Sequence, residues 1–439
     1  MQKILILGAG RSSPSAISYL ANNTANQFSI TVADLKQELA QKQIQGLPNC
    51  RAIGLDISKQ DLLKKEIEAH DLIISMLPAS FNYGLIKASI AQKKHVLTPS
   101  YQSKEVLALH QSAKENGVLV LNEMGLDPGI DHMSAMQIFD DLGDKGAMIK
   151  SFKSYTGGLV APESDDNPWG YKFSWNPRNV IIAGQGGAAK YLENGQEKYI
   201  PYHKLFSRLE QINVQGYGKF EGYANRDSLA YQKIYGLDNI ETLLRGTLRK
   251  KGYSQAWDAL VQLGMTDDGY QMKASSYADF TASFLPNSKS AGLAELASYL
   301  GVEASGDTIK KLSWLGLFDG TKKQLNASPA KILQDLLEEK WALKPDDKDM
   351  IVMSHEIIYE LDNTTKRLEA NLVLLGKDSV HTAMAMTVGY PIAIAAQLLL
   401  NGKLKLSGVR LPVTKDIYQP VLKELKKLGI GFSEKLTDV

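Results

Sequence analysis

The sequence predicts an α/β protein with a doubly wound parallel sheet, a second α/β domain and a helical insertion. Over the first 125 residues, short apolar runs alternate with amphipathic stretches, which is typical of βαβ units. A Gly-rich turn follows the first of these runs. After Gly125 the chain becomes rich in Gly, Tyr and Trp, and residues 237–340 carry mostly helical patterns.

The N-terminal region contains the strands and helices expected of the parallel sheet. Six apolar runs are expected strands: Lys3–Leu7, Ser29–Ala33, Arg51–Leu55, Leu72–Met76, His95–Thr98 and Val118–Asn122. Four helical patterns lie between them: Pro14–Ala21, Lys59–Ala69, Asn82–Gln92 and Lys104–Asn116. Because crossovers between parallel strands are right-handed, this order predicts a doubly wound sheet.

The rest of the chain is expected to form two insertions and then return to the first sheet. Residues 147–224 carry β-like runs, and residues 350–375 suggest a hairpin that rejoins the second domain. The clearest helical patterns of the insertion are Ser254–Leu263, Ala291–Tyr299 and Lys331–Glu339. The predicted domains are 1–126 plus 384–439 (dinucleotide binding), 127–236 plus 341–383 (the second α/β domain) and 237–340 (helical).

The stretch Thr382 to Gly402 has no charged side chain and is long enough to span a bilayer. Pro391 is expected to split it into shorter helical pieces, because proline suits the start of a helix. We therefore expect buried helices here rather than a membrane span.

Charge and cysteine content disfavour several classes of protein. The 439 residues include 50 Lys+Arg and 48 Asp+Glu, a net charge of +2, which argues against a general binder of nucleic acids. The single Cys50 and seven histidines without clustered ligands exclude intramolecular disulfides and argue against a metal enzyme. The N-terminus lacks the pattern of a signal peptide, so a cytoplasmic location is expected.

The segment Gly8 to Ser13, which follows the first expected strand, predicts a Rossmann-type nucleotide site. Gly8 permits the tight turn, and Gly10 lets a pyrophosphate approach the backbone at a helix N-terminus. Ser13 replaces the third glycine of the usual pattern. In this loop and at the ends of the third and fourth expected strands, the predicted cofactor contacts are Gly8, Gly10, Arg11, Ser12, Asp56 and Leu77.

Asp34 ends the second expected strand, 24 residues beyond Gly10. A carboxylate there can accept hydrogen bonds from both adenosine ribose hydroxyls and would repel a 2′-phosphate, so NAD is favoured over NADP. Lys36 could weaken this preference. The alternative interpretation of Asp34 is a solvated strand end or a helix cap.

Polar clusters follow the fifth and sixth expected strands, where ligands of open α/β sheets bind. The first is Thr98-Pro99-Ser100-Tyr101, and the second runs from Glu123 to His132. The second cluster could be a Pro-Gly turn in which Asp131 opens the next helix. That interpretation leaves Asp127 and His132 available for chemistry.

Seven blocks of the sequence are distinctive: GLDPGIDHM (125–133), SYTGGLVAPESDDNPWGYKFSW (154–175), NRDS (225–228), LRGTLR (244–249), WLGLF (314–318), KDMIVM (348–353) and TVGYPIAIA (387–395). With these blocks the chain resembles the saccharopine dehydrogenases of the saccharopine reductase branch. The blocks stay in order over nearly the whole chain and are weakest at 265–310.

The resemblance implies a homodimeric enzyme of lysine metabolism that oxidises saccharopine to L-glutamate and 2-aminoadipate 6-semialdehyde. It also implies a Rossmann domain completed by the end of the chain and an α/β domain that supplies much of the dimer contact. Fungal biosynthetic members use NADP and carry a Cys-Arg pair after the second strand. This chain has Asp34-Leu35 there, which resembles the NAD-using degradative members.

The resemblance also assigns roles to individual residues. The positions that match substrate contacts are Ser100, Tyr101, Asp127, Arg226, Thr247, Leu248 and Arg249. Those that match cofactor contacts are Pro99, Leu126, Pro128 and Asn176. Many members have Cys where this chain has Thr156, so either that thiol is dispensable or Thr156 only positions water.

The chemistry of saccharopine is consistent with these residue types. Its three carboxylates require donors, and arginine offers a bidentate fork. Hydride leaves the lysine ε-carbon for the nicotinamide, and water attacks the resulting imine. Asp127 and Tyr101 are the candidate general bases and His132 the third, and the sequence does not decide among them. The alternatives are an imine reductase like carboxynorspermidine or carboxyspermidine dehydrogenase, and a noncatalytic NAD-binding scaffold.

Overall fold

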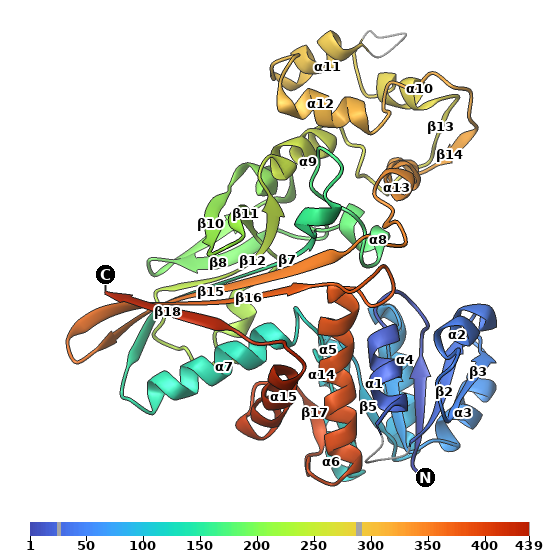
Figure 1. The fold of residues 1–439 in the computed structure, drawn as a ribbon, viewed down its shortest axis with the longest axis vertical. Coiled ribbons are helices and arrows are strands. Elements are labelled where there is room, and N and C mark those ends of the chain that lie inside the picture. The colour runs from blue at the N-terminus through green and yellow to red at the C-terminus, as the bar shows by residue number, and fades with distance from the viewer. Residues whose placement is uncertain (24–27, 287–291, 439) are drawn as a thin grey trace. The chain divides into compact units, whose positions relative to one another are not determined.

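The computed structural model describes residues 1–23, 28–286 and 292–438 (Figure 1). Its contacts divide the chain into two compact units. Unit 1 comprises Met1–Met148 and Gly376–Ser433, and unit 2 comprises Ile149–Leu375 and Glu434–Val439. The expected return of the chain to the first sheet is present for the strand at Gly408–Arg410, which belongs to unit 1, whereas the chain from Glu434 onward joins unit 2.

Unit 1 is built on a seven-stranded parallel sheet in the order β17-β6-β5-β4-β1-β2-β3. Its strands are β1 (Lys3–Leu7), β2 (Ser29–Asp34), β3 (Cys50–Gly54), β4 (Leu72–Ser75), β5 (His95–Leu97), β6 (Leu119–Leu121) and β17 (Gly408–Arg410). The strand order reverses direction between β1 and β4, so the ligand crevice is expected at their carboxyl ends. The predicted doubly wound sheet is confirmed.

Helices flank this sheet. They are α1 (Pro14–Ala21), α2 (Gln37–Gln43), α3 (Gln60–Glu68), η1 (Ala79–Phe81), α4 (Asn82–Ala91), α5 (Lys104–Leu107), α6 (His110–Glu115), α7 (Ile130–Gly143), α14 (Ala383–Leu400) and α15 (Lys415–Lys427). Helix α2 was not predicted, because only Ala40 of its seven residues is buried and no apolar stripe marks it. The predicted helix at 104–116 is two shorter helices, α5 and α6.

The expected division of 382–402 at Pro391 is wrong, because α14 is one continuous helix with Pro391 inside it. Thr382 caps its start by accepting a hydrogen bond from the Ala385 amide at 2.9 Å. The helix is long and apolar enough to cross a membrane, and 67% of its 18-residue apolar stretch is buried inside the protein. It packs closely on α1, since a Cβ on Gly389 would lie 2.7 Å from the Ala16 nitrogen.

Unit 2 contains a nine-stranded mixed sheet. Its main path is β10-β11-β12-β7-β15-β16-β18, and β8 pairs with β12 and β9. The strands are β7 (Met148–Val160), β8 (Ala189–Glu193), β9 (Gln196–Ile200), β10 (Glu210–Val214), β11 (Gly218–Ala224), β12 (Thr242–Lys250), β15 (Asp349–Leu361), β16 (Thr364–Leu375) and β18 (Ser433–Asp438). The predicted hairpin is confirmed as β15–β16, which turns at Asp362 and Asn363, both with positive φ.

The helical part of unit 2 shares one hydrophobic core with this sheet. Its elements are η2 (Pro162–Ser164), α8 (Pro177–Ile181), η3 (Tyr202–Ser207), η4 (Leu229–Tyr231), α9 (Tyr253–Gln262), β13 (Met272–Ala274), α10 (Tyr277–Ala282), α11 (Leu293–Leu300), α12 (Asp307–Trp314), β14 (Leu325–Ala327) and α13 (Pro329–Lys340). Two of the three expected helices correspond to α9 and α13. The third begins at Ala291, outside the described residues, and the rest of it corresponds to α11.

The domain boundaries differ from the expected ones. Residues 127–148 lie with unit 1 because α7 packs against α15, where the Tyr418 hydroxyl donates a hydrogen bond to Asp140. Residues 237–340 do not separate from the second domain by contacts, since Leu248 of β12, Trp257 of α9 and Leu333 of α13 belong to one buried cluster. The contacts therefore give two units rather than three.

Candidate active site

The loop between β1 and α1 has the geometry of a dinucleotide-binding turn. Gly8 has a φ of 100°, and a Cβ on it would lie 3.0 Å from the Met76 carbonyl oxygen, so both backbone and packing require glycine. A Cβ on Gly10 would meet no protein atom within 4 Å. The space beside Gly10 is therefore open to a ligand, as the proposed approach of a pyrophosphate requires.

Two side chains that are far apart in the sequence hold this loop. Ser13 is 1% exposed, and its hydroxyl lies 2.9 Å from the Gly10 oxygen and 2.7 Å from Gln43 Oε1. The Gln43 amide donates hydrogen bonds to the carbonyl oxygens of Ala9 (2.6 Å) and Gly10 (2.9 Å). Sequence reasoning missed Gln43 because it missed α2, the helix that carries it.

Asp34 lies at the end of β2 and contacts the same loop. Its Oδ2 accepts a hydrogen bond from the Ala9 amide at 2.8 Å, and its Oδ1 accepts one from the Lys36 amide at 3.0 Å. Because a carboxylate has about four acceptor positions, each oxygen can still accept a further hydrogen bond. The carboxylate is thus fixed beside the loop with capacity for two ligand hydroxyls.

The other predicted cofactor residues of unit 1 are less constrained. Arg11 is exposed, and Ser12 and Leu77 are half-buried. Asp56 accepts hydrogen bonds from the Ser58 hydroxyl (2.7 Å) and amide (3.0 Å), and these bonds hold the pKa of Asp56 below its usual value. Asp56 is therefore engaged in its own turn after β3.

The two predicted catalytic residues are brought together at the ends of β5 and β6. The Tyr101 hydroxyl donates a hydrogen bond of 3.2 Å to Asp127 Oδ1, and both side chains are half-buried. Backbone hydrogen bonds join the two loops, from Glu123 to the Ser100 oxygen and from Met124 to the Thr98 oxygen, each at 3.1 Å. The two strand-end clusters therefore lie side by side.

The Gly125–Gly129 turn is tightly folded around the predicted cofactor residues. The Gly125 amide donates to the Pro128 oxygen at 3.0 Å, and the Asp127–Pro128 peptide is cis. A Cβ on Gly125 would lie 3.0 Å from the Cβ of Pro99, and one on Gly129 would lie 2.1 Å from the Gly125 oxygen. Leu126 and Pro128 are therefore parts of one compact turn, and Pro99 of the neighbouring loop packs against it.

His132, the third candidate base, is fully buried between two carboxylates. Its Nε2 lies 2.8 Å from Glu123 Oε2, and its Nδ1 lies 3.5 Å from Asp131 Oδ2. Both ring nitrogens face protein groups, so direct proton transfer between this ring and a substrate is disfavoured. The sequence assigns no role to Glu123, which belongs to the polar cluster after the sixth expected strand. The structure shows that Glu123 contacts His132.

Unit 2 carries the predicted substrate residues of β12. Arg249 is 5% exposed, and its Cζ lies 5.1 Å from the centre of the Tyr171 ring and 5.2 Å from that of Tyr253. Its Nη1 donates a hydrogen bond to the Leu248 oxygen at 2.9 Å. Among the described residues, its Nε has no hydrogen-bond partner. The aromatic rings hold the guanidinium in place while leaving it a donor for a ligand.

Strand geometry places two hydroxyls on the same face as this guanidinium. Side chains alternate along a strand, so Thr247 and Arg249 share a face of β12. Thr156 of β7 is paired in register with Thr247 and is 8% exposed. Within the described part of the chain the Thr156 hydroxyl lacks a partner. Leu248 points to the opposite face and into the core, so only its backbone remains for the predicted substrate contact.

The other two predicted residues of unit 2 lie in loops. Arg226 is exposed, has a φ of 54°, and accepts a hydrogen bond from the Lys190 amide through its carbonyl oxygen at 2.8 Å. Asn176 caps α8, where its side-chain oxygen accepts a hydrogen bond from the Arg178 amide at 3.0 Å. The predicted cofactor contact of Asn176 would therefore come from its amide nitrogen.

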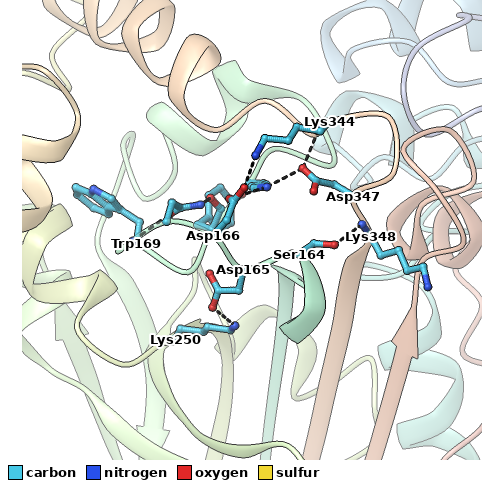
Figure 2. Close-up of polar contacts among 11 residues, drawn as sticks. Ser164, Asp165, Asp166, Trp169, Lys250, Lys344, Asp347 and Lys348 are labelled. Carbon is cyan, nitrogen blue, oxygen red and sulfur yellow. Dashed lines mark hydrogen bonds and ion pairs between the residues drawn. The ribbon is translucent and has the colours of Figure 1, made fainter.

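An ion-pair network supports the segment that carries Tyr171 (Figure 2). Lys172 is 3% exposed, and its Nζ lies 2.8 Å from Asp166 Oδ1 and 2.6 Å from Asp347 Oδ2. Lys344 also pairs with Asp166, and hydrogen bonds from these two lysines lower the pKa of Asp166 to about 2. The network ties residues 164–173 to the loop at 344–348 and so positions Tyr171 against Arg249.

Two families of known protein domains match this chain. The family described as saccharopine dehydrogenase NADP binding domain matches residues 4–121, and the saccharopine dehydrogenase C-terminal domain matches residues 125–430. The chain belongs to the saccharopine dehydrogenase family. Among the residues that the structure describes, no group of three or more His, Cys, Asp or Glu side chains could hold a metal ion.

Relatives in this family match over the whole chain. Saccharopine dehydrogenase [NADP(+), L-glutamate-forming] of Saccharomyces cerevisiae is 34% identical over 99% of both chains. A solved apo structure of the yeast enzyme matches with a TM-score of 0.90 over 100% of both chains. The mitochondrial alpha-aminoadipic semialdehyde synthase of Mus musculus is 34% identical over 99% of this chain, which spans 48% of the mouse protein.

A more distant structure shows the fold alone. The homospermidine synthase of Legionella pneumophila, solved with NAD, matches with a TM-score of 0.57 at 10% identity, over 100% of this chain and 92% of that chain.

Proposed function

We propose that this protein is a saccharopine dehydrogenase that forms L-glutamate and 2-aminoadipate 6-semialdehyde with NAD as the oxidant. Full-length similarity to L-glutamate-forming relatives supports the reaction. The observation that carries it is the Tyr101–Asp127 hydrogen bond at the carboxyl ends of β5 and β6, in the unit that also carries the dinucleotide loop. A noncatalytic scaffold would have no need of this pair.

The preference for NAD rests on Asp34. The names of the fungal relatives specify NADP(+), and the matching N-terminal family is described as an NADP binding domain. In this chain, however, the carboxylate of Asp34 is held 2.8 Å from the Ala9 amide of the nucleotide loop. Like charges about 4 Å apart repel by about 4 kcal/mol at an effective dielectric constant of about 20, which disfavours a 2′-phosphate there. NAD use in turn supports a role in lysine degradation.

The residues of the loop fit a bound dinucleotide. The open space beside Gly10 and the N-terminus of α1 would receive its pyrophosphate, and the two oxygens of Asp34 would accept its ribose hydroxyls. When bound, the nicotinamide accepts hydride from the substrate carbon next to the secondary amine. The protein's own part is then to bind the carboxylates and to move protons.

The remaining steps are assigned to side chains described above. Arg249 and Arg226 donate hydrogen bonds to substrate carboxylates. Asp127, oriented by the Tyr101 hydroxyl, accepts the proton of the secondary amine and returns it to the imine nitrogen. It then accepts a proton from the attacking water and passes that proton to the nitrogen of the leaving glutamate. General base catalysis of this kind contributes roughly 10²–10⁴-fold.

The test is a direct assay of the purified chain. Saccharopine and NAD+ should give a rise in the near-ultraviolet absorbance of NADH, with L-glutamate as product. No rise with saccharopine, together with turnover of carboxynorspermidine, would replace the substrate. No turnover of either compound, with NAD still bound, would favour the scaffold.

Two further parts of the proposal rest on the family resemblance and the sequence. We propose a homodimer, which size-exclusion chromatography with light scattering would test against a monomer. We also propose a cytoplasmic location, without a nucleic-acid or membrane partner, which fractionation of cells would test.

A further inference from the structure

A row of three buried, titratable side chains contacts the two loops that carry Tyr101 and Asp127. Glu123, His132 and Asp131 are 2%, 0% and 1% exposed. Buried charges are costly unless they are paired and hydrogen-bonded. The reaction steps assigned above use none of these three groups, so their cost calls for an explanation.

The two ends of this row are anchored beside the two candidate catalytic residues. At one end, Glu123 Oε1 accepts a hydrogen bond of 2.9 Å from the amide of Gln102, the residue after Tyr101. At the other end, Asp131 Oδ1 accepts a hydrogen bond of 2.6 Å from the amide of Gly129, two residues after Asp127.

The imidazole of His132 joins the two ends. Its Nε2 lies 2.8 Å from Glu123 Oε2, and its Nδ1 lies 3.5 Å from Asp131 Oδ2. The row therefore links the Gln102 amide of the loop after β5 to the Gly129 amide of the turn after β6, in addition to the backbone hydrogen bonds between the two segments. A change at His132 would loosen the position of one loop relative to the other.

The backbone at Glu123 supports a functional reason for the row. Its φ is 59°, in the left-handed region, which costs a non-glycine residue about 1–2 kcal/mol. Backbone strain of this kind is concentrated at functional sites. A purely structural interpretation, in which Asp131 caps the start of α7, explains Asp131 but not the glutamate or the histidine.

We propose that Glu123 and His132 are positioning residues that fix the separation of Tyr101 and Asp127. They act through the Gln102 and Gly129 amides and do not themselves exchange protons with the substrate. This inference rests on the proposed function, since it assigns proton transfer to the Tyr101–Asp127 pair.

The test compares Glu123→Gln and His132→Gln with Glu68→Gln, an exposed control on α3. Because a misplacement of about 1 Å can cost about 10²-fold, kcat with saccharopine is expected to fall about 10- to 100-fold in both variants. The Kd for NAD+, measured by fluorescence, should stay within about threefold, since the contacts of the loop at Gly8–Ser13 are unchanged. The control should match the wild type.

The pH profile separates positioning from direct proton transfer. A positioning role lowers kcat/KM at every pH and leaves its inflection points unmoved. Loss of an inflection in His132→Gln would make His132 the base and overturn the proposal. A kcat per folded molecule within about twofold of the wild type would overturn it as well.

A double-mutant cycle with Tyr101→Phe provides the second measurement. If His132 acts through the pair, the effects of His132→Gln and Tyr101→Phe are less than additive. Additive effects would overturn the proposal. Should His132→Gln fail to fold, Glu123→Asp serves in the same cycle, because it keeps the charge and shortens the side chain. An inactive wild type would instead overturn the proposed function, and this inference with it.

Discussion

Replacing Arg249 by lysine keeps a positive charge on β12 but removes the planar guanidinium held by Tyr171 and Tyr253. The guanidinium is 5% exposed and its Nε has no partner among the described residues. A lysine ammonium cannot reproduce a bidentate fork. We therefore expect the loss of at least one charge-assisted hydrogen bond to a substrate carboxylate, about 1.5–3 kcal/mol.

That loss corresponds to a rise of about 10- to 150-fold in the KM for saccharopine, measured by initial rates at saturating NAD+. Because the bond is made in both ground and transition states, kcat should stay within about threefold. Arg245→Lys is the matched control, since Arg245 lies on the same strand, 6% exposed, with its Cζ 4.2 Å from the Tyr231 ring centre. Equal KM effects in both variants, or an unchanged KM in Arg249→Lys, would show that Arg249 does not bind a substrate carboxylate.

Three further predictions follow from the contacts. Asp34→Ala should lower kcat/KM for NAD+ about 10- to 100-fold, because it removes the charged acceptors of the ribose hydroxyls. It should raise kcat/KM for NADP+, because it removes the repulsion of the 2′-phosphate. A parallel fall of kcat/KM for both cofactors would contradict this prediction. Gln43→Leu should raise the Kd for NAD+ about 5- to 100-fold by removing the hydrogen bonds of Gln43 with Ala9, Gly10 and Ser13, with the KM for saccharopine unchanged. Equal NAD+ affinity in the variant and the wild type would show that the loop keeps its conformation without Gln43. The ion pairs of Asp166 with Lys172 and Lys344 lower its pKa to about 2, so they stabilise the fold above about pH 4 and are lost as pH falls toward 2. In Asp166→Asn, the free energy of unfolding measured in urea should therefore change less between pH 5 and about 2.5 than in the wild type. An unchanged pH dependence would mean that other groups cause the acid sensitivity.

The parallel sheet could be predicted because its strands are nearly continuous apolar runs. Strands buried on both faces, such as β1 and β4, read this way, and the helices between them have clear apolar stripes. Helix α2 buries only Ala40, so its sequence gives no periodic signal. The sequence predicts a break at Pro391, whereas α14 is continuous, with its start capped by Thr382 and with Gly389 packed closely on α1.

The site could be predicted only where neighbours in sequence share a strand end. Asp34 and the Tyr101–Asp127 pair follow from the rule that ligands bind at the carboxyl ends of parallel strands. The contacts of Arg249 with Tyr171 and Tyr253 depend on how distant segments pack, which no periodicity encodes. The same holds for Gln43, whose amide reaches the loop from a helix that the sequence did not reveal.

We propose that this member of the family oxidises saccharopine with NAD. Initial rates of the purified protein with saccharopine, measured with NAD+ and NADP+ in parallel, are the decisive experiment. We predict turnover to L-glutamate with a higher kcat/KM for NAD+ than for NADP+. A higher kcat/KM for NADP+ would contradict the role of Asp34, and no turnover of saccharopine with either cofactor would contradict the proposed reaction.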